Sequence, residues 1–93
     1  MADSELIFTG TRREIAGGEF VEFLGDRGGE TLRFWITPEA LNTLADDEPV
    51  PTLLGAFDRW IEEIWRMAQN KVANGSPEQE GAYIIRERDF WRD

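Results

Sequence analysis

The stretch from Thr52 to Asn74 constrains the fold of this chain more than any other, because its apolar residues recur with the period of an α-helix. Apolar residues three or four positions apart form a stripe along one side of a helix, and polar residues occupy the other side. Gly75 and Pro77 follow, as is common where a helix ends. We therefore predict one long amphipathic helix whose stripe is buried against another element. The stripe consists of Leu53, Phe57, Trp60, Ile61, Ile64, Ala68 and Val72.

A β-hairpin earlier in the chain is the obvious surface for that stripe. Residues 19–24 and 31–36 are rich in aromatic and β-branched side chains, and the glycine-rich segment 25–29 between them is typical of a hairpin loop. In the second strand the residues alternate in character, as expected of a sheet with one buried face. The alternation places Leu32, Phe34 and Ile36 on one face and Thr31, Arg33 and Trp35 on the other.

Three shorter segments complete the pattern. Residues 5–9 are consistent with an edge strand or an ordered N-terminal arm, and residues 82–86 with a final strand. Between them Thr37 is a typical N-cap residue, and Pro38 fits the first helical position, where its missing N–H costs nothing. We expect this short helix to end near Ala45.

The order of these elements predicts an α+β fold. We expect a small, mainly antiparallel sheet, made of the N-terminal strands, the hairpin and the C-terminal strand. A short helix and one long amphipathic helix should pack on one face of it. Residues 1–93 should form a single domain, in which a short N-terminal segment and the C-terminal tail can be flexible.

The composition removes most known site chemistry. The 93 residues include no histidine and no cysteine. The chain therefore has no histidine or cysteine for a Ser-His-Asp or Cys-His nucleophile, a structural zinc site or an iron–sulfur cluster. No phosphate-binding loop or dinucleotide fingerprint is present either. We expect no catalytic residues, no cofactor and no metal ligands, and what remains is carboxylate chemistry or binding.

The charge balance bears on partners and location. Nineteen acidic residues against ten basic ones give a net charge of −9, which disfavours direct binding to nucleic acid or to an anionic membrane. No apolar run is long enough for a membrane span or a signal-peptide core. We expect a bacterial cytoplasmic protein with a protein partner or self-association. Since the acidic residues are spread along the chain, solubility is the first explanation of the charge.

Two acidic groups are candidates for function. Paired carboxylates can support acid–base chemistry or bind Mg²⁺ or Ca²⁺, but they do so in a shaped pocket that separates their pKa values. The sequence indicates no such pocket, so we interpret these residues as a candidate acidic surface. It comprises Asp46, Asp47 and Glu48 in a loop, and Asp58, Glu62 and Glu63 in the long helix.

The tryptophans are the candidate interaction residues, because tryptophan is enriched where proteins bind one another. Trp60 lies within the apolar stripe and is expected in the core. The candidate interface comprises Trp35, Trp65 and Trp91. For each of them the alternative is ordinary packing.

Five short motifs follow one another over residues 6–90. They are Val21-x-Phe23, the run from Phe34 to Leu41, Leu54-x-Ala56-Phe57-Asp58, Gly81-x-Tyr83-x-Ile85, and Asp89-Phe90. Their order resembles the small bacterial family catalogued as domain of unknown function 1488. The chain departs from that family in a longer acidic loop before the final strand and in the extension after Phe90. The resemblance implies a compact α+β fold, and because the family has no established activity it assigns no functional residues.

Three functions are compatible with the sequence. The first is a non-enzymatic macromolecule-binding or regulatory module that uses an exposed aromatic patch. The second is an acidic inhibitor or nucleic-acid mimic of the phage anti-defence type, which blocks a DNA- or RNA-binding complex with carboxylates at phosphate-like spacing. The third is a divalent-cation-dependent enzyme that gathers carboxylates from several elements.

Overall fold

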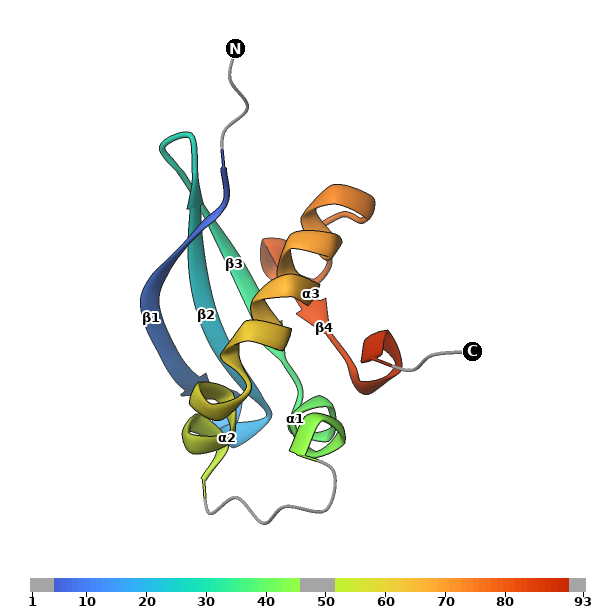
Figure 1. The fold of residues 1–93 in the computed structure, drawn as a ribbon. Helices are drawn as coiled ribbons and strands as arrows, with labels where there is room; N and C mark the ends of the chain where they lie inside the picture. The colour runs from blue at the N-terminus through green and yellow to red at the C-terminus, as the bar shows by residue number, and fades with distance from the viewer. Residues whose placement is uncertain (1–4, 46–51, 91–93) are drawn as a thin grey trace.

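A four-stranded sheet with the order β1-β2-β3-β4 carries the structure, a computed structural model that describes residues 5–45 and 52–90 (Figure 1). The first three strands are antiparallel neighbours, and the last strand runs parallel to β3. The strands are β1 (Ile7–Ile15), β2 (Phe20–Arg27), β3 (Glu30–Ile36) and β4 (Ala82–Ile85).

The helices cover one face of this sheet (Figure 1). The predicted α+β class, with a mainly antiparallel sheet packed on one face, is therefore confirmed. No helix in the described ranges is both long and apolar enough to cross a membrane. The helices are α1 (Pro38–Ala45), α2 (Leu53–Arg59) and α3 (Ile61–Asn74), with short 3₁₀ turns η1 (Ala16–Gly18), η2 (Gln79–Gly81) and η3 (Glu87–Phe90).

The prediction of one continuous helix from Thr52 was wrong. The backbone of Trp60 has φ −109° and ψ 24°, outside the helical range, and it separates α2 from α3. The change of direction lets α2 pack against β1 and β2 while α3 packs against β4. Hydrogen bonds still cross the break, from Trp60 N to Ala56 O at 3.1 Å and from Ile64 N to Trp60 O at 3.0 Å. The apolar period therefore continues through it, which is why the sequence does not reveal the break.

The hairpin is tighter than predicted. The strands continue to Arg27 and Glu30, which pair directly, so that only Gly28 and Gly29 form the turn. Their φ angles of 59° and 86° lie in the left-handed region that a two-residue hairpin turn of this kind needs and that glycine adopts without strain. The first strand also differs, since β1 extends to Ile15 through polar residues that carry no apolar alternation.

Aromatic side chains dominate the core between the sheet and the helices. The rings of Phe23 and Phe34 stack with centroids 5.2 Å apart, and Phe34 stacks on Tyr83 at 5.4 Å. Phe57 of α2 meets Phe23 at 5.0 Å, and Trp65 of α3 meets Phe34 edge-on at 5.9 Å. The predicted inward residues of β3 are fully or half-buried here, so the alternation in this strand is confirmed. The opposite side chains of β3 therefore lie on the face away from the helices.

Candidate functional site

The face of the sheet away from the helices, called the open face below, carries one row of side chains across all four strands. Arg13 of β1 pairs in register with Glu22 of β2, Glu22 pairs with Trp35 of β3, and Trp35 pairs with Ile84 of β4. Residues directly opposite each other on neighbouring strands point to the same side and lie within reach of each other. The row therefore brings an arginine, a carboxylate and an indole together on the open face.

Trp35 is buried although no described helix residue packs on it. It is 5% exposed and clusters with Ala82 and Ile84, while Phe20 and Ile15 pack at the side. The ring of Phe20 lies with its centroid 4.9 Å from the ring of Trp35. All five residues lie in strands, so the open face has a small apolar centre of its own.

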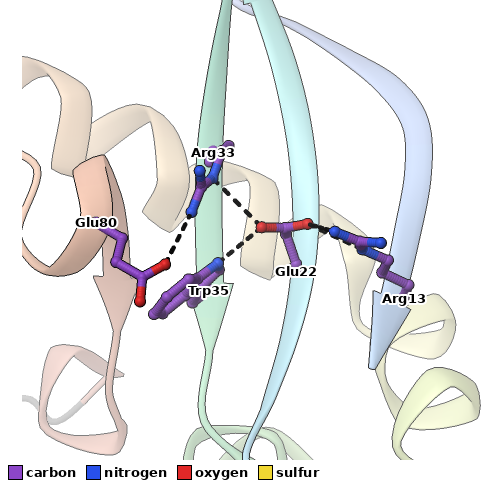
Figure 2. Close-up of polar contacts among 5 residues, drawn as sticks. All are labelled: Arg13, Glu22, Arg33, Trp35 and Glu80. Carbon is purple, nitrogen blue, oxygen red and sulfur yellow. Dashed lines mark hydrogen bonds and ion pairs between the residues drawn. The ribbon is translucent and has the colours of Figure 1, made fainter. Parts of the chain in front are cut away.

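Glu22 is the buried polar residue next to that centre, with a side chain that is only 8% exposed. Its Oε2 accepts a hydrogen bond from the indole Nε1 of Trp35 at 2.9 Å (Figure 2). Its Oε1 accepts one from Nε of Arg13 at 3.1 Å, and Nη2 of Arg13 lies 3.0 Å away. Burying a carboxylate is costly unless it is paired and hydrogen-bonded, and these contacts meet that requirement. They also hold the indole of Trp35 in one orientation.

Arg33 has the fewest hydrogen bonds of these charged and aromatic side chains on the open face. Its Nε lies 3.4 Å from Oε2 of Glu22, and its Nη2 lies 4.0 Å from Oε1 of Glu80 in η2 (Figure 2). The guanidinium stands over the Trp35 ring, 5.7 Å from the centroid. The Nε atom is fully buried, and within the described residues it has no hydrogen-bond partner. Arg33 therefore keeps donors that its own neighbours do not use.

These side chains line a hollow of about 580 Å³ on the open face. Its walls combine charged groups, the edge of an indole and aliphatic side chains, a mixture common in sites that recognise peptides or small molecules. The lining residues are Arg13, Ile15, Glu22, Leu24, Thr31, Arg33, Trp35 and Glu80.

A second hollow, of about 500 Å³, lies between the end of α3 and the η3 turn. Its two charged lining residues, Lys71 and Asp89, pair with each other at 3.0 Å. Asp89 also accepts a hydrogen bond from the backbone N–H of Arg86 at 2.8 Å. These contacts satisfy the charged groups within the fold, so the open face is the better candidate site.

The structure separates the tryptophans of the predicted interface. Trp35 lies on the open face, whereas Trp65 is half-buried on the covered face, where its ring lies 5.4 Å from that of Phe8. Trp91 lies outside the described residues. Trp60 packs half-buried against the core, as expected of the stripe. The structure thus does not bring Trp35 and Trp65 to one surface.

The predicted acidic surface is also divided. Asp58 forms two hydrogen bonds with Arg12, from Nε to Oδ1 and from Nη2 to Oδ2, both at 2.7 Å. The hydrogen bond lowers the pKa of Asp58, burial opposes this shift, and the positive charge of Arg12 adds to it. Glu62 and Glu63 lie in the first turn of α3, and residues 46–48 (Asp46, Asp47 and Glu48) lie outside the described ranges. Within those ranges no group of three or more acidic residues is placed to hold a metal ion.

Sequence reasoning missed Glu22, Arg13 and the role of Arg33. A signal for Glu22 was present, because it alternates with Val21 and Phe23, which are both buried on the covered face. The period of the strand therefore places it on the open face. The contact with Arg13 had no such signal, since it depends on the register of β1, which shifts between Phe8 and Arg12.

The fold and the site together define a small α+β domain with one helix-covered face and one open face centred on a buried carboxylate. The family model described as "Protein of unknown function (DUF1488)" matches residues 6–85, and the chain belongs to this family. No curated protein gives a significant match.

A solved structure supports the fold. The chain is similar to the crystal structure of a protein of unknown function from the DUF1488 family of Shewanella loihica PV-4, with a TM-score of 0.77 and 18% sequence identity. The similarity covers 91% of this chain and 94% of that chain. At this identity the likeness establishes the arrangement of strands and helices.

Proposed function

We propose that this protein is a non-enzymatic binding module of the bacterial cytoplasm, which holds a partner protein on its open face. The observation that carries the proposal is the buried Glu22–Trp35 pair on a face that no described helix covers. An outer sheet face needs only polar side chains in water, and burying a carboxylate there offers no evident advantage for stability. A rigid indole beside a hollow is useful for recognition, because a side chain that is already ordered loses little entropy on binding.

The composition of the open face supports the same function. Tryptophan and arginine are the residues most enriched where binding energy concentrates, and here they meet around a hollow of about 580 Å³. Half-buried Ile15, Phe20 and Leu24 add apolar surface beside them. Aromatic residues and arginine are both enriched at protein interfaces relative to the rest of the surface.

A protein is favoured over a nucleic acid as the partner. The net charge of −9 repels a polyanion at long range, and the open face offers two guanidiniums rather than a basic stripe. The nucleic-acid mimic has less support, because Arg12 neutralises Asp58, one of the carboxylates it would present. Enzyme chemistry remains a hypothesis for which the described residues supply no cluster of acidic groups.

Affinity capture from the native host tests the proposal. The baits are the wild-type chain, Leu24→Glu on the open face and Gln69→Glu on the exposed side of α3. Both substitutions add one negative charge, and Leu24→Glu also removes an apolar side chain from the open face. We expect a partner protein that the wild type and Gln69→Glu retain at high salt and that Leu24→Glu loses.

Thermal unfolding of the three baits checks that each is folded. Titration of the purified partner against each bait by calorimetry then gives the affinities. A partner that binds Leu24→Glu as tightly as the wild type would show that binding occurs elsewhere on the molecule, and the proposal would be abandoned.

A further inference from the structure

Two arginines and two glutamates line the hollow of the open face. Two guanidiniums, of Arg13 and Arg33, flank the single buried carboxylate of Glu22. Glu80 is the next carboxylate, but its side chain is 69% exposed and it lies 4.0 Å from Arg33. An exposed pair at that distance contributes little. Arg13 is hydrogen-bonded to Glu22, whereas Arg33 makes no hydrogen bond to either carboxylate, so its guanidinium is the local site for an anion on a chain with a net charge of −9.

The carboxylate of Glu22 accepts hydrogen bonds from Arg13 and Trp35 and none from Arg33. Its Oε1 serves Arg13, and its Oε2 serves the indole of Trp35 at 2.9 Å. Nε of Arg33 lies 3.4 Å from Oε2 without forming a hydrogen bond, and it has no other partner in the described part of the chain. Because this Nε is buried, an acceptor supplied from outside cannot reach it and would meet the exposed Nη groups of the same guanidinium instead.

Arg33 is placed to meet such an acceptor. Its side chain is 41% exposed and lines the hollow, while the Trp35 ring beneath it restricts where the guanidinium can lie. A guanidinium presents its donors in a planar fork that matches the two oxygens of a carboxylate. Leu24 lines the same hollow and offers an apolar contact beside the fork.

We propose that Arg33 binds a carboxylate side chain of the partner protein, next to an apolar residue of that partner that packs on Leu24. This inference rests on the proposed function and adds the chemistry of the partner. A single carboxylate in a protein segment fits better than a polyphosphate, because the net negative charge of the chain opposes the approach of a polyanion.

Two model peptides test the inference without knowledge of the partner. The probes are acetyl-Leu-Glu-Leu-amide and its uncharged counterpart acetyl-Leu-Gln-Leu-amide, titrated into ¹⁵N-labelled protein. The readouts are the NMR shifts of the Trp35 indole N–H and the Arg33 Nε–H. We expect the Glu peptide to bind about tenfold more tightly than the Gln peptide, the typical gain from a charge-assisted hydrogen bond.

Arg33→Gln should remove this preference, so that both peptides bind equally weakly. The matched control is Arg27→Gln at the exposed end of β2, which should keep the preference. Equal affinities of the two peptides for the wild type, or no shift with the Glu peptide, would overturn the inference even if Arg33→Gln failed to fold. A preference that survives in folded Arg33→Gln would also overturn it.

A titration with inorganic phosphate at matched ionic strength tests whether the site prefers phosphate to a carboxylate side chain. If phosphate shifts the same resonances and displaces the Glu peptide, the site selects phosphate and the carboxylate partner is wrong. The affinity capture with Leu24→Glu is independent of these titrations. A partner lost by Leu24→Glu together with a failed peptide preference would leave the proposed function standing and remove only the carboxylate at Arg33.

Discussion

The two faces of the sheet place neighbouring aromatic residues of one strand in opposite kinds of environment. Phe34 points to the covered face, is fully buried and stacks between Phe23 and Tyr83. Trp35 points to the open face, is almost as buried, and donates a hydrogen bond to Glu22. Both residues are buried by apolar packing, and the open face adds a hydrogen bond to a buried carboxylate. Burial alone therefore does not tell on which face of the sheet a residue lies.

The two faces also differ in the contacts that stabilise them. The covered face joins strands β2, β3 and β4 to helices α1, α2 and α3 through apolar contacts, which supply the main favourable contribution to folding. The open face holds the buried carboxylate of Glu22, whose contacts offset the cost of its burial. The guanidinium of Arg33 lies beside it without a hydrogen bond from its Nε. Substitutions on the two faces should therefore differ in what they damage.

The largest effect is expected at the centre of the covered face. Phe23→Ala should lower the free energy of unfolding by about 3–5 kcal/mol, because it removes buried ring contacts and leaves a cavity. The matched change on the open face, Phe20→Ala, should cost clearly less, since Phe20 is only half-buried. Urea unfolding followed by circular dichroism measures both. Equal losses would show that the two faces contribute alike and would remove the contrast.

An intermediate effect is expected at the carboxylate of the open face. Glu22→Ala leaves the buried indole N–H of Trp35 without its acceptor and frees Arg13, so we expect a loss of about 1–3 kcal/mol. Glu22→Gln keeps an acceptor for the indole and should lose less. The same urea experiment decides between them. If Glu22→Ala were as stable as the wild type, the network would not hold Trp35 in place.

The smallest effect is expected at the ion pair between Arg12 and Asp58 on the covered side of β1. Arg12 lowers the pKa of Asp58 in the folded state below its ordinary value of 3.8. Asp58 therefore takes up a proton less readily in the folded protein than in the unfolded chain. The ion pair stabilises the folded protein at pH values above 3.8, and this contribution is lost as the pH falls through the lowered pKa. The wild type should be slightly more stable than Asp58→Asn at neutral pH.

That small advantage should disappear in acid. Melting temperatures of the wild type and Asp58→Asn, compared from neutral pH to acid pH, measure it. High salt should shrink the difference at neutral pH as well, because both side chains are partly exposed. An advantage of the wild type that grows in acid would contradict the assigned direction of the pKa shift.

The elements were predictable where local patterns carried the information. The hairpin, the helix start at Thr37 and the inward residues of β3 follow from alternation and capping, which depend on near neighbours in the chain. The break at Trp60 did not follow, because hydrogen bonds and the apolar period both continue across it. Alternation along β3 already placed Trp35 on the face opposite Phe34, whereas the face on which Trp65 lies depends on how α3 docks.

The sequence by itself determined the α+β class, one covered sheet face and the apolar stripe, since each follows from a period of two or 3.6 residues along the chain. Only the tertiary structure decided that Arg13, Glu22 and Arg33 meet. Their meeting depends on the register between three strands, and a shift of one residue in any strand would turn its side chain to the other face. The candidate site is therefore a product of strand pairing, and no single segment of the chain encodes it.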